Sequence, residues 1–107
     1  MKKFYNKLVR DKIVEIIESK GENPEYETLN SERYLFELHK KLLEEANEFI
    51  EEDSPEELAD LLEVVYAIAK LKNIDLKEVE EIRIEKSQKR GAFEKKLFLK
   101  SVDEKDE

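Results

Sequence analysis

The sequence predicts an all-α fold, a four-helix bundle with a single core. Two observations indicate this fold. Apolar side chains recur with a helical period through most of the 107 residues, and residues that start or end helices separate the periodic stretches. A chain of this length is expected to form one domain, over residues 1–100, followed by an acidic, disordered tail over residues 101–107.

The first helix is expected over residues 11–20. Asp11 is the expected N-cap, and Gly21 supplies the left-handed residue that commonly ends a helix. Residues 22–30 have no helical period, and Pro24 cannot donate a helical hydrogen bond. This stretch is therefore expected to be an extended connector.

The second helix is expected over residues 32–52, capped by Asn30 or Ser31. Its apolar residues form one stripe: Leu35, Leu38, Leu42, Leu43, Ala46, Phe49 and Ile50. Glu45 lies at the edge of this stripe and Glu48 somewhat farther round, so both are expected to reach the interior of the bundle. Glu44 lies farther round still and is expected to face water.

The third helix is expected over residues 55–72, because Ser54 and Pro55 form a strong helix start. From Leu58 to Leu71 this helix is apolar on nearly every side, which is more than one small bundle can cover. We therefore expect a second subunit to cover it, in a homodimer or a homotetramer.

The fourth helix is expected over residues 76–90 and ends at Gly91. Lys86 and Arg90 follow its apolar side toward the C-terminus. Basic residues there either complement the helix dipole or hold phosphate groups. The segment 92–102 carries several large apolar side chains and is expected to pack back on the bundle.

The charge is unevenly distributed along the chain. Residues 1–12 carry five basic and one acidic side chain, and residues 83–100 carry seven and two, whereas residues 13–82 carry 21 acidic and seven basic side chains. An acidic middle with basic ends suits a cation bound centrally and an anion held from the flanks. It argues against binding of a nucleic-acid polymer, which needs a continuous basic surface. The alternative is that these charges only solvate helix faces.

The chain contains no cysteine, so thiolate metal sites and thiol nucleophiles are excluded. No apolar run is long enough to span a bilayer, and the amino terminus lacks the apolar core of a signal peptide. We therefore expect a cytoplasmic protein with no membrane association.

Two acidic pairs, Glu45 with Glu48 and Glu57 with Asp60, lie on either side of the predicted turn between the second and third helices. Each pair has the i, i+3 spacing that places both carboxylates on one helix face. In an antiparallel hairpin the four carboxylates would converge, which is unfavourable without a cation among them. Oxygen ligands of this kind suit Mg²⁺, with Mn²⁺ as an alternative.

A simpler interpretation exists for Glu57, which has the position of a capping-box partner of Ser54. Taken alone, this residue would favour capping. The three other carboxylates shift the balance toward a metal site.

The paired E-x-x-E and E-x-x-D motifs resemble those of the all-α nucleotide pyrophosphohydrolases, which include the MazG-like enzymes and phosphoribosyl-ATP pyrophosphohydrolase. The stretches Tyr5–Ile13 and Lys89–Glu94 look like a subfamily described as phosphoribosyl-ATP pyrophosphohydrolase-like. The resemblance covers nearly all of residues 4–99. The spacer of eight residues between the acidic pairs is shorter than in many MazG-like relatives, so the turn must be tight.

This resemblance implies cleavage between the α- and β-phosphates of a nucleotide, which gives a monophosphate and pyrophosphate. Glu45, Glu48, Glu57 and Asp60 would hold Mg²⁺, and Glu45 is also the candidate general base. Lys86 and Arg90 would hold phosphate oxygens, with Lys7 and Arg10 as weaker candidates for the same role.

Several functions stay open at this point. The substrate is either a noncanonical or excess nucleotide, in a house-cleaning role, or the phosphoribosyl-ATP of histidine synthesis. The alternative from another class is a helical interaction module without catalysis.

Overall fold

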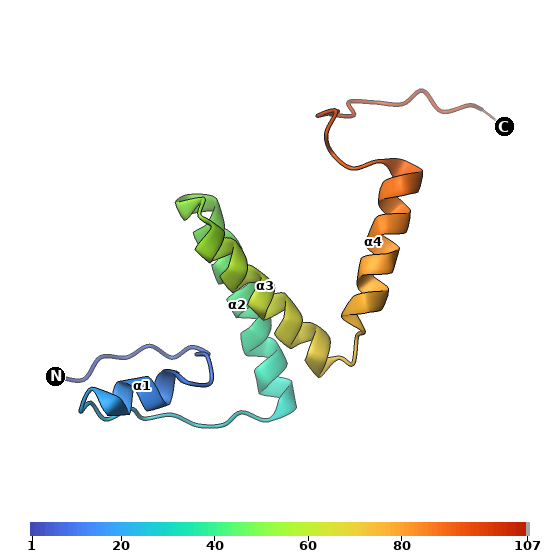
Figure 1. The fold of residues 1–107 in the computed structure, drawn as a ribbon. Coiled ribbons are helices and arrows are strands. Elements are labelled where there is room, and N and C mark those ends of the chain that lie inside the picture. Colours follow the sequence, from blue (N-terminus) through green and yellow to red (C-terminus); the bar gives the residue numbers. More distant parts are fainter. Residues whose placement is uncertain (107) are drawn as a thin grey trace. The chain divides into compact units, whose positions relative to one another are not determined.

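The computed structural model describes residues 1–106, and this part of the chain contains four α-helices and no strand (Figure 1). The helices are α1 (Ile13–Ser19), α2 (Ser31–Glu52), α3 (Pro55–Leu71) and α4 (Leu76–Arg90). The predicted all-α class is confirmed. Glu107, the last residue of the predicted tail, lies outside the described residues. No helix of the described part is long and apolar enough to cross a membrane.

The chain divides into two compact units between Asp75 and Leu76. The first unit contains α1, α2 and α3, and the second contains α4 and the segment that follows it. The expectation that residues 1–100 form one domain stays a prediction.

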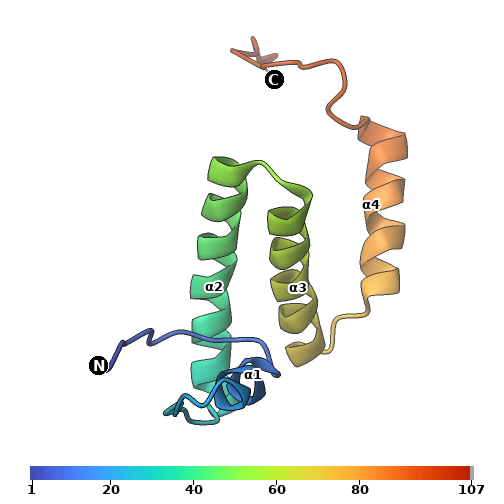
Figure 2. The same cartoon turned by 60° about the vertical axis from the view of Figure 1, so that its left-hand side comes forward.

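An antiparallel hairpin of α2 and α3 forms the centre of the first unit, and the two helices lie side by side in both views (Figures 1 and 2). The connection is short because Asp53 takes a left-handed conformation, with φ 50°, and Ser54 already caps α3. Ser54 Oγ accepts a hydrogen bond from Glu57 N at 3.3 Å, and Pro55 occupies the first turn of the helix. The predicted tight turn and helix start are both present.

The core of the first unit is small. Within residues 1–106 the buried apolar side chains are Leu38, Val64 and Ala69. Ile13, Val14 and Ile17 of α1 are only half-buried. Most of the remaining apolar surface of the hairpin is exposed, which bears on the question of self-association below.

The start of α1 differs from the prediction. Lys12, not Asp11, is the N-cap residue, and no side chain caps the helix. The backbone accounts for the difference, since Arg10 O accepts a hydrogen bond from Ile13 N at 3.0 Å and so makes a turn before the helix. Gly21, with φ 81°, ends the helix as expected, and its amide donates to Glu18 O at 3.0 Å. At the next helix, Asn30 is the N-cap and accepts from Arg33 N at 2.9 Å.

In the second unit, α4 ends at Arg90 and Gly91 follows with φ 82°, as predicted. No residue of α4 is buried, and the side chains of Phe93, Leu97, Phe98 and Leu99 are exposed. The packing of segment 92–102 on the bundle stays a prediction.

Candidate metal centre

The interface between α2 and α3 contains one buried carboxylate, that of Glu45. Its side chain is 9 % exposed, and within residues 1–106 no other charged residue is buried. The position follows from the helical period, because Glu45 lies seven residues after the buried Leu38 and therefore on nearly the same face of α2. A fully charged carboxylate at such a position needs a partner of opposite charge or a proton.

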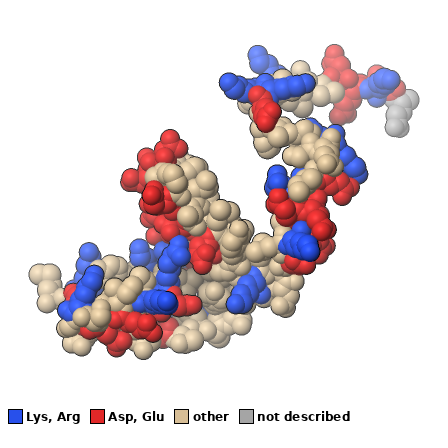
Figure 3. All heavy atoms as spheres, in the orientation of Figure 1, with Lys and Arg blue, Asp and Glu red and all other residues tan. Residues whose placement is uncertain are grey.

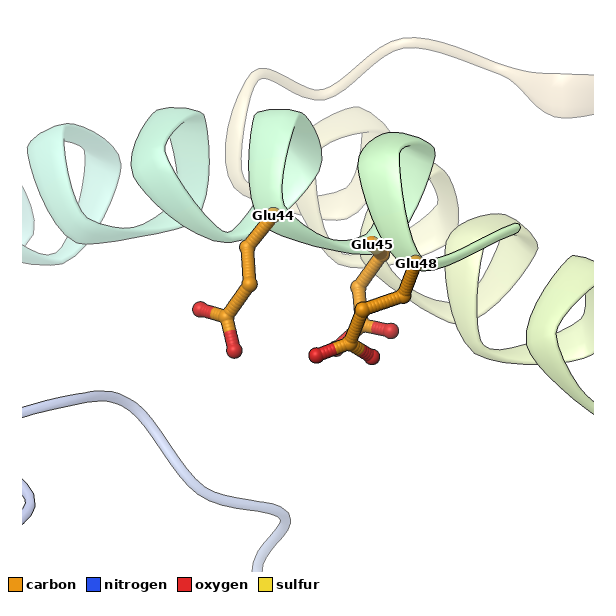
Figure 4. A group of neighbouring side chains, drawn as sticks. All are labelled: Glu44, Glu45 and Glu48. Carbon is orange, nitrogen blue, oxygen red and sulfur yellow. The ribbon is translucent and has the colours of Figure 1, made fainter. Parts of the chain in front are cut away.

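Glu45 belongs to two groups of carboxylates at once. In one group, oxygens of Glu44, Glu45 and Glu48 lie within 4.8 Å of one another. In the other, Glu45 meets Glu57 and Asp60 of α3 at the same separation. The structure therefore brings all four sequence-predicted ligands around one shared side chain. Figure 4 shows the three carboxyl groups of α2 projecting from the same side of the helix.

Glu44 was expected to face water, but its carboxylate joins this group and is about one-third exposed, at 35 %. The sequence did contain a signal for it. Glu44 and Glu48 have the i, i+4 spacing that places two side chains on one helix face. Glu44 was not among the predicted ligands, because those were chosen by their i, i+3 spacing.

The electrostatics of the cluster favour a cation. The pKa of the Glu45 carboxyl is raised above its ordinary value, first by burial and then by the negative charge of Glu48, while Lys41 acts in the opposite direction. Asp60 and a hydrogen bond shared with Glu48 raise it further. A bound proton thus relieves part of the repulsion, and a divalent cation would relieve more of it.

Two buried oxygens of the cluster accept no hydrogen bond from any group within residues 1–106. They are Oε2 of Glu45 and Oε2 of Glu57. Buried polar atoms are nearly always paired, so two unpaired carboxylate oxygens at one place fit a site that could hold a cation. Helix capping does not account for them, because the capping bond at Ser54 involves the Glu57 backbone amide. Carboxylate oxygens are the donors that hard divalent cations take.

Three basic residues of the first unit form ion pairs with carboxylates of the cluster. Arg10 Nη2 donates to Asp60 Oδ1 at 2.7 Å, and Arg10 Nη1 lies 4.0 Å from Glu63 Oε1. Lys7 Nζ lies 3.6 Å from Glu44 Oε1. Lys41, on α2 itself, lies 3.5 Å from Glu45 Oε1 and 3.7 Å from Glu44 Oε1.

The surface reflects this distribution of charge. Figure 3 shows Asp and Glu gathered over the tip of the α2–α3 hairpin, whereas Lys and Arg lie among acidic side chains over the N-terminal segment and α1. The ion pairs of Lys7 and Arg10 show that the segment before α1 supplies positive charge to the site.

Lys86 and Arg90, the stronger phosphate-binding candidates from the sequence, lie on α4 in the second unit. Together with Ile82, Glu85 and Lys89 they line a shallow hollow on that helix. Their role toward a phosphate stays a prediction.

No family model, no curated protein and no solved structure matches this chain. The acidic cluster, which could hold a metal ion, is thus the feature from which a function must be argued.

Proposed function

We propose that this protein is a Mg²⁺-dependent nucleotide pyrophosphohydrolase with a MazG-like helical fold. It would cleave between the α- and β-phosphates of a nucleotide to give a monophosphate and pyrophosphate. The observation that carries the proposal is the pair of carboxylate groups that share the buried Glu45, with its unpaired Oε2. The resemblance of the acidic and flanking motifs supplies the reaction type.

Each side chain of the cluster has a task in this proposal. Glu45, Glu48, Glu57 and Asp60 would hold the cation from two helices, and Glu44 lies within the 4.8 Å group of Glu45 and Glu48. A Mg²⁺ ion held by these carboxylates would supply positive charge to neutralise phosphate oxygens and would lower the pKa of a bound water molecule. Glu45 is the candidate for accepting a proton from the attacking water, because its carboxylate belongs to both groups of proposed ligands.

The phosphate groups need positive partners beyond the cation. Arg10 and Lys7 lie at the edge of the cluster, where a phosphate held by the cation would also sit. Arg10 offers a guanidinium, which binds phosphate in bidentate fashion. Lys86 and Arg90 of α4 are proposed as further phosphate-binding residues.

Self-association is part of the proposal, and the hairpin supports it. Phe36, Leu43 and Ile50 of α2 are 64 %, 67 % and 75 % exposed, and their spacing of seven residues places them on one stripe. On α3, Leu58, Leu62 and Val65 form a second exposed stripe.

Each stripe faces away from the acidic cluster on its own helix. At ~100° per residue, Leu43 is about 160° from Glu45 around α2, and Leu62 is about 160° from Asp60 around α3. Subunits packed against these stripes would leave the carboxylates of the cluster uncovered.

The decisive experiment measures pyrophosphate release from a panel of canonical and noncanonical nucleoside triphosphates and phosphoribosyl-ATP. Wild-type protein with Mg²⁺ should release pyrophosphate from at least one of them, and Glu45→Gln should abolish the release. Glu56→Gln is the matched control, because it removes one carboxylate from the exposed face of α3 near the cluster.

The panel also separates the alternatives. A preference for phosphoribosyl-ATP would assign the protein to histidine synthesis, and a preference for a noncanonical nucleotide to a house-cleaning role. If no nucleotide yields pyrophosphate with Mg²⁺ or Mn²⁺, the proposal is refuted and a helical interaction module is the better description.

A further inference from the structure

We propose that the segment 1–12 is a strap that a divalent cation releases: Arg10 holds Asp60 when the cation is absent and transfers to a phosphate when the cation binds. The proposal rests on the proposed cation site and adds an order of events to it. Its evidence is the set of ion pairs between this segment and the acidic cluster.

The strap contacts the cluster at two carboxylates that belong to the candidate ligand groups. Arg10 donates to Asp60 at 2.7 Å, and Lys7 lies 3.6 Å from Glu44. Asp60 lies on α3 and Glu44 on α2, so the strap reaches both helices of the hairpin. Glu44 and Asp60 are also members of the two different groups that share Glu45.

The pairs are accessible, which is what exchange requires. The side chains of Arg10 and Asp60 are 58 % and 42 % exposed, and those of Lys7 and Glu44 are 45 % and 35 % exposed. Exposed ion pairs of this kind are weak, and they open and close readily. The buried Glu45 contrasts with them, because its ion pair within the described residues is with Lys41 of its own helix.

A divalent cation and the strap compete for the same negative charge. A cation in the group of Glu45, Glu57 and Asp60 would bind an oxygen of Asp60, and a guanidinium 2.7 Å from Asp60 would then lie close to a doubly positive ion. That repulsion, with the loss of free negative charge on Asp60, weakens the hold on Arg10. The released Arg10 and Lys7 become donors beside a cation, which is the arrangement that binds a phosphate group.

The affinities for the cation and for the anion should therefore depend on Arg10 in opposite directions. Removing the guanidinium removes a competitor of the cation, so the cation should bind more tightly. It also removes a phosphate donor, so an anion that binds over the cation should bind more weakly. A variant that lost its fold or the geometry of the site would bind both the cation and the anion more weakly.

The test uses the full-length protein and isothermal titration calorimetry with two probes, Mg²⁺ alone and inorganic pyrophosphate in saturating Mg²⁺. For Arg10→Gln we expect Mg²⁺ to bind about 2- to 5-fold more tightly, the range that corresponds to an exposed ion pair. Pyrophosphate should bind at least about 10-fold more weakly, since a charge-assisted contact to an anion is lost.

Lys12→Gln is the matched control. It removes the same charge from the same segment, and Lys12 has no ion pair within the described residues. Both affinities should stay within about 1.5-fold of wild type, because an exposed charge with no close partner acts only through screened, long-range forces. Equal effects of Lys12→Gln and Arg10→Gln would overturn the proposal.

Any other combination of changes in the affinities for Mg²⁺ and pyrophosphate also overturns the proposal. If Arg10→Gln weakens both ligands, Arg10 only positions Asp60, and if it changes neither, the ion pair has no role in binding. If Arg10→Gln changes the two affinities in opposite directions but no nucleotide yields pyrophosphate, the strap is kept and the proposed catalysis is refuted. If a nucleotide yields pyrophosphate but Arg10→Gln does not change the two affinities in opposite directions, the proposed catalysis is kept and the strap is refuted.

A measurement on wild-type protein removes any dependence on the variants. The Arg10 Nε–Hε resonance in a ¹⁵N-edited NMR spectrum reports whether the guanidinium is held. We expect it to be observable without cation, to weaken through faster exchange with water when Mg²⁺ is added, and to return when pyrophosphate follows. A resonance that Mg²⁺ leaves unchanged would overturn the release step.

Discussion

Glu45→Gln should stabilise the cation-free protein, although it removes a buried charged group. Oxygens of Glu44, Glu48, Glu57 and Asp60 lie within 4.8 Å of Glu45 in their groups. At that separation one pair of like charges repels by about 1 kcal/mol in water and about 3 kcal/mol at an effective dielectric constant of 20.

Lys41, at 3.5 Å, offsets part of this repulsion, and partial protonation offsets more. We therefore expect a net gain of about 1–2 kcal/mol on neutralisation. The glutamine amide keeps the shape of the side chain and can donate to one of the neighbouring carboxylates.

The assay is thermal unfolding in EDTA and in excess Mg²⁺. In EDTA, Glu45→Gln should raise Tm by at least about 4 °C, because 1 kcal/mol corresponds to about 4–8 °C in a domain of this size. In wild type, Mg²⁺ at 100 times its Kd should add about 2.7 kcal/mol of stability, and the variant should lose most of that increment.

Glu56→Gln, which neutralises an exposed carboxylate of α3, should change neither value appreciably. A lower Tm of Glu45→Gln in EDTA would refute the reasoning, since it would show that Glu45 is already well paired without a cation.

Four further predictions address the other parts of the structure. Asp60→Asn should also abolish the Mg²⁺ increment in Tm, but it should stabilise the cation-free protein less than Glu45→Gln does, because it loses the pair with Arg10. In EDTA, wild-type stability should fall as the pH rises through the raised folded-state pKa of Glu45, since the folded protein binds that proton more tightly than the unfolded chain, and the slope should be smaller in Glu45→Gln; denaturant titrations between pH 4.5 and 8 measure it. Leu62→Glu on the exposed apolar stripe should convert the predicted dimer or tetramer to a monomer in light scattering, whereas an unchanged mass would place the subunit contact elsewhere. Ser54→Ala should lower the free energy of unfolding by about 1 kcal/mol in denaturant titrations, through loss of the hydrogen bond from Glu57 N, and no change would mean that the cap contributes nothing.

The helices could be predicted because their ends are determined locally. Asn30, Ser54, Gly21 and Gly91 act through hydrogen bonds and backbone conformations within a few residues of themselves. The sequence carries such information directly. The one cap that was wrong, Asp11, lies inside the backbone turn that Ile13 N and Arg10 O close before α1.

The acidic cluster was predictable for a similar reason, since two i, i+3 pairs beside a tight turn must face each other in a hairpin. The contacts of Arg10 were not predictable in the same way. Its partner Asp60 is 50 residues away in the sequence, and the segment that carries Arg10 has no period that would indicate its direction. Contacts of that kind depend on tertiary packing.

The turn at Asp53 and Ser54 has a consequence for how this chain can vary. Only two residues separate Glu52 from Pro55, so the length of this turn determines which residues of α3 lie opposite Glu45. One inserted residue would change the position from which α3 leaves the turn and so displace Glu57 and Asp60 from Glu45. Most surface loops tolerate changes of length, but at this one an insertion would remove two of the carboxylates that surround Glu45 while leaving both helices intact. The length of this turn is therefore as much a property of the site as the identity of its ligands.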